Sequence, residues 1–71
     1  MFKPREQVVW SYRQRGGRAS ILVDAEVVHY GERRTCIRIR TTHVVLLRWV
    51  HPKNLRMKGA GEPAYPYPVS N

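Results

Sequence analysis

The chain has little cysteine, few acidic residues and no long apolar run, and each shortage excludes something. Cys36 is the single cysteine among 71 residues, so no internal disulfide can stabilise the fold. A chain of this length buries only roughly 60% of the surface that it exposes when unfolded. Stability is therefore expected to come from packing, from closure of a sheet or from oligomerisation, and a spacious buried active site is not expected.

The apolar stretches are all much shorter than the roughly 20 residues that a bilayer crossing needs. No signal-peptide pattern follows Met1. We therefore expect a cytoplasmic protein without a membrane partner.

Acidic side chains are scarce, since five Asp and Glu face 13 Lys and Arg, which gives a formal net charge of +8 and a pI of about 10.6. A pI above roughly 9 is typical of nucleic-acid binders, although ribosome partners and acidic proteins also attract basic surfaces. Ten of the basic residues are arginine, which favours planar, bidentate contacts to phosphate or carboxylate.

Patterns of catalytic or metal-ligating residues are missing too. There is no C-x-x-C motif and no closely spaced pair among His29, His43 and His51. The strand phase argued below directs His29 inward and Cys36 outward, which separates the two groups of a thiol–imidazole pair. We expect no enzymatic activity, no cofactor and no metal.

What the sequence has in quantity is period-two alternation of apolar and polar residues, which indicates half-buried strands. The clearest case follows Arg34, where Ile37 and Ile39 alternate with Arg38 and Arg40. The alternation predicts strands at Gln7–Tyr12, Ser20–Tyr30, Thr35–Arg40, Val44–Trp49 and Leu55–Met57, with a 3₁₀ turn at Pro52–Leu55. We therefore predict an all-β fold, a small barrel of about five antiparallel strands in which the long second strand bends to serve two sheets.

The pairing of the second and third strands follows from keeping carboxylates out of the core. If opposed residue numbers sum to 64, Glu26 lies opposite Arg38 and Asp24 opposite Arg40 on the outer face, while Val27 faces the core. Registers with odd sums turn both carboxylates toward isoleucines, at a cost of several kcal/mol unless they are paired or neutralised. Carboxylates paired with arginine are poor general acids or bases, which again argues against catalysis.

The next hairpin joins its strands by two or four polar residues. A sum of 83 pairs Ile39 with Val44 and Ile37 with Leu46 inside the core, with the turn at residues 41–42. Two threonines are not the preferred residues of a two-residue hairpin turn.

The outer face in this arrangement combines arginines with apolar groups, and Trp10 is assigned to the core. The residues predicted to bind nucleic acid are Arg13, Arg15, Arg18, Arg34, Arg38, Arg40, Tyr30 and Trp49. The arginines would contact phosphates and the two aromatic rings would stack on exposed bases. The first three belong to a Gly-containing loop that is expected to be mobile. The residues predicted to form an apolar interface strip are Val28, Cys36, Val45 and Leu47.

The composition changes at Gly59. Residues 59–71 are rich in glycine and proline, have no periodicity and carry Glu62 as their only charge. We expect a barrel at residues 1–58 and a flexible tail at 59–71, with polyproline II character around Pro63–Pro68. Tyr65 and Tyr67 of the tail are candidates for docking on another module or on the barrel's own apolar face.

The first strand opens with FKPREQVVW and the predicted barrel closes with WVHPKNLRM, with a Gly-bearing loop and three meandering strands between them. Over residues 2–58 this pattern resembles the SH3-like small barrels, and within them it is similar to KOW- and Tudor-type modules and to short bacterial proteins of one barrel. It departs from that group at Arg5-Glu6, where such barrels usually have a Gly-Asp turn. The resemblance implies association with RNA, DNA or the ribosome.

Two functional hypotheses follow. The first is a module that binds RNA or DNA with low specificity, because the chain has no recognition helix and no Asn/Gln cluster to read base edges. The second is a protein-interaction or assembly module that forms a homodimer or binds an acidic protein through the apolar strip.

Overall fold

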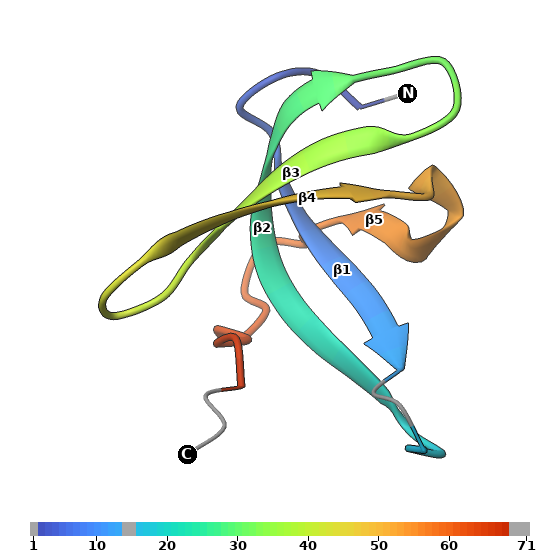
Figure 1. Cartoon of the computed structure of the whole chain (residues 1–71). Coiled ribbons are helices and arrows are strands. Elements are labelled where there is room, and N and C mark those ends of the chain that lie inside the picture. Colours follow the sequence, from blue (N-terminus) through green and yellow to red (C-terminus); the bar gives the residue numbers. More distant parts are fainter. Residues whose placement is uncertain (1, 14–15, 69–71) are drawn as a thin grey trace.

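The computed structural model describes residues 2–13 and 16–68, and it has an all-β fold (Figure 1). Five antiparallel strands form one sheet in the order β4-β3-β2-β1-β5. Their bounds are β1 Gln7–Arg13, β2 Ser20–Tyr30, β3 Thr35–Arg40, β4 Val45–Val50 and β5 Leu55–Met57, with the 3₁₀ helix η1 at Pro52–Asn54. The predicted fold class, the strand number and the 3₁₀ turn before the last strand are confirmed.

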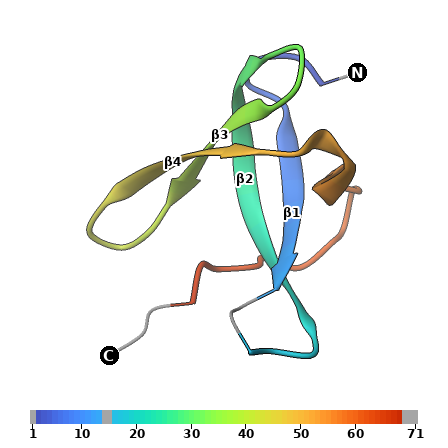
Figure 2. The same cartoon turned by 45° about the vertical axis from the view of Figure 1, so that its right-hand side comes forward.

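Over the described ranges the sheet is not closed into a barrel, because β4 and β5 are its two edges. The long strand β2 joins its halves, since its residues up to Glu26 pair with β1 and those from Glu26 onward pair with β3. It bends, so that β3 and β4 run across β1 (Figures 1 and 2). The core lies inside this bend and consists of Val8, Val23, Ala25, Val27, Ile37, Ile39, Val50 and Leu55. Within the described part of the chain there is no helix with the length and hydropathy that spanning a membrane requires.

The predicted register between β2 and β3 is confirmed only near its centre. Glu26 faces Arg38 and Val27 faces Ile37, as a sum of 64 requires. An irregularity between Val27 and His29 then shifts the pairing by one residue, so that His29 faces Cys36. Because one extra residue inverts the phase of a strand, His29 is exposed where an inward side chain was expected. Cys36 was expected to be exposed but is buried, with an exposed fraction of 5%.

The predicted pair of Asp24 and Arg40 is absent from the ion pairs found among the described residues. Asp24 instead accepts a 2.8 Å hydrogen bond from Lys58 Nζ. Its backbone N–H donates to the carbonyl of Tyr65 at 2.8 Å. Hydrogen bonds of successive residues alternate between the two sides of a strand, so Asp24, like Glu26, bonds on the β3 side of β2. The chain end therefore binds β2 where the predicted register had placed Arg40.

The β3–β4 register differs from the prediction by two residues. Ile39 faces Leu46 and Ile37 faces Arg48, a sum of 85 rather than 83. The turn is longer because the Thr41 hydroxyl donates to the Val44 carbonyl at 2.9 Å and accepts from the Val44 N–H at 3.0 Å. A shift of two residues preserves the side on which each side chain lies, so the predicted outward positions of Val45, Leu47 and Trp49 are correct although the partners are not. Val44 was predicted to lie in the core opposite Ile39, but it belongs to the turn and is 53% exposed.

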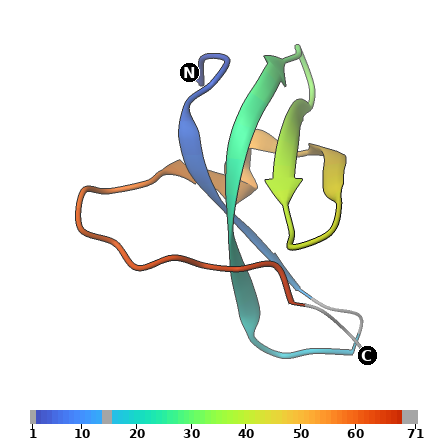
Figure 3. The same ribbon diagram turned by 90° about the vertical axis from the view of Figure 1, so that its left-hand side faces the viewer.

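The C-terminal segment has no regular secondary structure, and after β5 it first loops away from the sheet and then returns across it (Figure 3). Tyr67 packs against the core, as one of the two docking alternatives for the tail tyrosines proposed. Glu62 receives two hydrogen bonds from Arg56, at 2.6 and 2.8 Å, and one from the Gly59 N–H at 2.7 Å. These bonds to the charged form lower the pKa of Glu62 to about 2.

Candidate nucleic-acid interface

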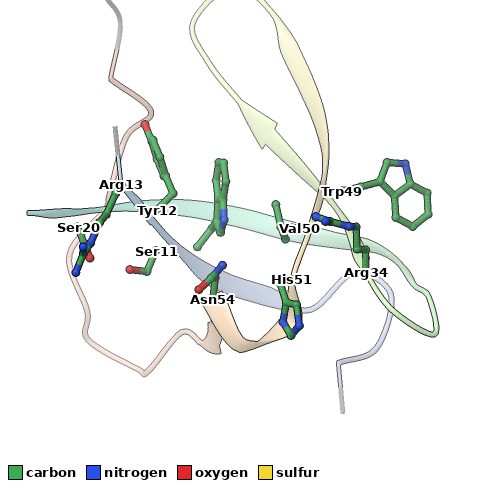
Figure 4. Close-up of a pocket in the computed structure, with 10 residues that line it drawn as sticks. Ser11, Tyr12, Arg13, Ser20, Arg34, Trp49, Val50, His51 and Asn54 are labelled. Carbon is green, nitrogen blue, oxygen red and sulfur yellow. The ribbon is translucent and has the colours of Figure 1, made fainter. Parts of the chain in front are cut away.

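A groove of about 540 Å³ opens between β1 and the connection from β4 to η1 (Figure 4). Its walls come from the second half of β1, the first residue of β2, the β2–β3 loop, the end of β4 and η1. The lining residues are Trp10, Ser11, Tyr12, Arg13, Ser20, Arg34, Trp49, Val50, His51 and Asn54. Three of them, Arg13, Arg34 and Trp49, belong to the predicted nucleic-acid set, so sequence positions up to 36 residues apart meet in one site.

Aromatic rings form part of the groove wall. Trp10 and Tyr12 alternate along β1 and therefore lie on one face, where their ring centroids are 4.4 Å apart and the rings are 21° from parallel. Tyr67 of the chain end continues this stack, 6.4 Å from Tyr12. Partial burial and the neighbouring Tyr67 raise the pKa of the Tyr12 hydroxyl above its ordinary value.

Arginines lie at the two ends of the groove. Figure 4 shows Arg13 beside Ser20 at one end and Arg34 beside Trp49 at the other. Both arginines are exposed, and neither takes part in the ion pairs found in the described ranges. The described residues that line the groove include no Asp or Glu. Among its described lining residues the groove therefore offers a ligand two arginines outside these ion pairs and no carboxylate that would repel an anion.

His51 and Asn54 contribute hydrogen-bonding groups between these ends. His51 caps η1, because its Nδ1 accepts a 3.2 Å hydrogen bond from the Lys53 N–H. An acceptor at Nδ1 assigns the proton of a neutral imidazole to Nε2, which is then a donor. The cap thus fixes both the position and the tautomer of a donor in the groove wall.

The outer face of β2 and β3 is a different environment from the groove. Arg38 donates to Glu26 at 2.8 Å, and both side chains are partly exposed. Arg40 is exposed near the same hollow, which Asp24 and Glu26 also line. The predicted pair of phosphate-binding residues on this face, Arg38 and Arg40, therefore lies among carboxylates and away from Arg13 and Arg34.

The remaining predicted ligand contacts are scattered. Arg18 is exposed in the β1–β2 connection but does not line the groove. Arg15 lies outside the described residues. Tyr30 is partly exposed and packs against Phe2, with ring centroids 6.4 Å apart, and it too is not part of the groove wall.

The predicted apolar strip is present in altered form on the edge strand β4. Val45 and Leu47 are each 54% exposed and Trp49 is 57% exposed. Cys36 does not extend the strip, because it faces both His29 and Trp49 across the sheet and these rings meet in an edge-on contact 6.0 Å apart. Val28 lies at the register shift and is half-buried.

The sequence analysis missed Trp10, Tyr12, His51 and Asn54 as parts of a site. The alternation of β1 was a signal for the first two, but a closed barrel would have buried both rings. Among the described residues no group of three or more His, Cys, Asp or Glu is arranged to hold a metal ion.

Comparison of this chain with protein-family models, with curated proteins and with solved structures found no match. A function is therefore inferred from the groove and its chemistry.

Proposed function

We propose that this chain is a non-catalytic module that binds RNA or DNA with low sequence specificity through the groove. The observation that carries the proposal is the composition of the groove wall, which combines aromatic rings with an arginine at each end and has no carboxylate among its described residues. Nucleic-acid sites combine cations for phosphates with aromatic faces for bases in this way.

The distribution of acidic residues supports the same proposal. Asp24, Glu26 and Glu62 are ion-paired with Lys58, Arg38 and Arg56. Each of these three pairs is neutral and lies away from the groove, so the net charge of +8 is the balance of the other ten basic residues and the two other acidic residues, Glu6 and Glu32. A protein with this excess of positive charge attracts polyanions over a distance set by the ionic strength.

Low specificity follows from the polar groups that the groove supplies. Among the described residues of its wall Asn54 is the only amide side chain, and the described part of the chain contains no α-helix to enter a major groove. Sequence discrimination depends on several directed contacts to base edges, which this wall does not provide.

The SH3-like resemblance, with KOW- and Tudor-type modules as its nearest members, is part of the proposal. The resemblance is supported by the meander of β1 to β4 and by the 3₁₀ helix before β5. It is not supported by the sheet of the described residues, which is open rather than closed into a barrel. A cytoplasmic location is proposed on the same footing, and the free thiol of Cys36 fits a reducing compartment.

The proposal is tested by titrating a fluorescein-labelled mixed oligonucleotide with the protein at several salt concentrations and recording anisotropy. We expect Arg13→Gln with Arg34→Gln to weaken binding and to lower the slope of log K against log salt by about 1 for each lost phosphate contact. The matched control is Arg38→Gln with Arg40→Gln, which removes the same charge from the other face and should have the smaller effect. Absence of binding at low salt, or equal losses in the two double variants, would contradict the groove as the site.

A second candidate function, assembly through β4, is favoured by the exposure of Val45, Leu47 and Trp49 on an edge strand. Exposed apolar patches commonly mark interfaces, and edge strands have unpaired backbone groups. Sedimentation velocity over a wide concentration range tests it. A monomer at the highest concentration would exclude a homodimer, and a dimer that Leu47→Lys dissociates would establish one.

A further inference from the structure

Resting on the proposed function, we infer that the ligand of the groove is single-stranded nucleic acid. In this arrangement a base stacks on Trp10, at the end of the stack that Trp10 forms with Tyr12 and Tyr67, and the phosphates on either side of the base contact Arg13 and Arg34. The positive charge of the protein alone specifies neither the strandedness of the ligand nor the rings that hold it.

The groove presents a concave surface lined by aromatic rings. Aromatic side chains stack on the flat faces of bases, and these faces are available only when the base is not already stacked in a duplex. A duplex is read differently, because a convex helix or two-stranded ribbon enters its groove and meets base edges. Here the rings line a hollow between two elements, and a hollow can receive a base but cannot enter a duplex groove.

The arrangement of the rings also favours a single strand. Trp10 and Tyr12 are already stacked, and Tyr67 continues the stack beyond Tyr12 without lining the groove. The stack therefore reaches the groove through the two rings of β1. Both are held by their strand and half-buried, so little conformational freedom is lost when a base is added to them.

The position of the charges fits a single strand as well. Arg13 and Arg34 lie at opposite ends of the groove, with Tyr12, His51 and Asn54 between them (Figure 4). A strand that passes through the groove can place phosphates at both ends while its bases face the wall. Contacts of this kind tolerate any sequence, since every base has a face to stack.

The competing mode is a duplex bound by the β3–β4 hairpin, which extends from the body of the molecule (Figures 1 and 2). A two-stranded ribbon can enter a major groove. The hairpin is poorly suited to this, because its turn Thr41–Val44 has no Lys or Arg and Arg38 is already paired with Glu26. Arg40, beside the turn, lines a hollow together with the carboxylates Asp24 and Glu26. The observations therefore favour the groove.

The experiment compares one mixed 12-nucleotide strand with the duplex of the same sequence, as DNA and as RNA, by anisotropy. A second readout uses Trp49→Phe, in which Trp10 is the only tryptophan, so its fluorescence reports stacking directly. We expect the single strand to bind at least tenfold more tightly than the duplex and to quench Trp10. The reciprocal variant Trp10→Phe, which retains only Trp49, should show less quenching.

Removal of the ring supplies the energetic test. Trp10→Leu should weaken single-strand binding by about 5- to 140-fold, the range that corresponds to 1–3 kcal/mol per stacked base. Trp10→Phe should recover part of the loss. If Trp10→Leu does not fold by circular dichroism, the quenching of Trp10 in the Trp49→Phe protein decides the question.

The outcomes separate the two levels of the proposal. Duplex binding as tight as single-strand binding, or saturation by a single strand without any change in Trp10 emission, overturns the inference and leaves nucleic-acid binding intact. Absence of binding to both forms at low salt overturns the proposed function itself.

Discussion

Arg5 has a backbone conformation that arginine rarely adopts, with φ of 72°. It occupies the turn Lys3–Glu6, in which the Glu6 N–H donates to the Lys3 carbonyl at 3.2 Å and the Arg5 N–H donates to Val27 at 2.7 Å. Left-handed backbone costs a residue with a Cβ roughly 1–2 kcal/mol, and glycine avoids this cost. In the proposed resemblance to SH3-like barrels, this turn takes the place of a Gly-Asp turn.

We predict that Arg5→Gly raises the free energy of unfolding by about 0.5–1 kcal/mol, since relief of the strain exceeds the extra freedom that glycine gives the unfolded chain. Urea denaturation measures the change. Arg5→Ala is the control, because it removes the same side chain but keeps the strain, and it should bring no gain. A destabilised Arg5→Gly protein would mean that the arginine side chain contributes more than its backbone costs.

The stability of the fold should depend on pH through Glu62. Its pKa in the folded protein is about 2, below the usual value of 4.5, because Arg56 and the Gly59 N–H bind the carboxylate. A lowered pKa contributes stability that is fully present above the unfolded value and is lost as the pH falls toward the folded one. The contribution of Glu62 should therefore disappear between about pH 4.5 and pH 2.

We predict that Glu62→Gln lowers the melting temperature at pH 7 and removes part of the decline that the parent protein shows over this acid range. Thermal melts from pH 7 down to pH 2 provide the comparison. Glu32→Gln is the control, since Glu32 is exposed and has no ion pair in the described part of the chain. Parallel pH profiles for Glu62→Gln and the parent would show that the contact with Arg56 does not hold in solution.

At the scale of the elements, the β3–β4 turn depends on one side chain. The Thr41 hydroxyl both donates to and accepts from the backbone of Val44, whereas Thr42 makes no such bond among the interactions found in the described ranges. We predict that Thr41→Val destabilises the fold by about 1 kcal/mol, the usual net value of an intramolecular hydrogen bond. Thr42→Val should stay within about 0.5 kcal/mol of the parent. Equal effects of the two changes in urea denaturation would contradict this account of the turn.

The same hairpin shows how far a sequence pattern determines a sheet. Leu46 was placed toward the core, with Val45 and Leu47 outward, by pairing it with an inward isoleucine of β3, because β4 has apolar residues on both of its faces. The alternation could not distinguish a register in which opposed residue numbers sum to 83 from one in which they sum to 85, since both registers keep that phase. The hydrogen bonds of the Thr41 hydroxyl in the turn favour the register with the sum of 85. The alternation of apolar and polar residues contains no information about these bonds.

The register shift in β2 could not be predicted from the alternation either, for a related reason. Val27 and Val28 are adjacent apolar residues, so either phase is compatible with the residues that follow. Once the strand shifts after Val27, His29 moves outward and Cys36 is covered by the rings of His29 and Trp49. Exposure of the groove residues Trp10 and Tyr12 was missed because it depends on whether the whole sheet closes.

At the scale of the whole molecule, the chain end is part of the fold. Tyr65 bonds β2 at Asp24 through two backbone N–H groups, its own and that of Asp24, and Tyr67 packs on the core. We predict that removing residues 59–71 destabilises the protein by about 1–3 kcal/mol, the range for burying one large side chain. Urea denaturation measures the loss, and Tyr67→Ala alone should reproduce a large part of it. A truncated protein as stable as the parent would show that the segment does not dock.

Docking of the chain end on β2 also has a consequence for the order of folding. Strands β1 to β4 pair with their neighbours along the chain, whereas the hydrogen bond from Tyr65 to Asp24 joins residues 41 positions apart. Contacts that close long loops tend to form after local ones, because the entropy of closure must first be overcome. An interaction absent from the transition state changes the unfolding rate and not the folding rate. In stopped-flow experiments, loss of the chain end should therefore speed unfolding while refolding keeps nearly its original rate.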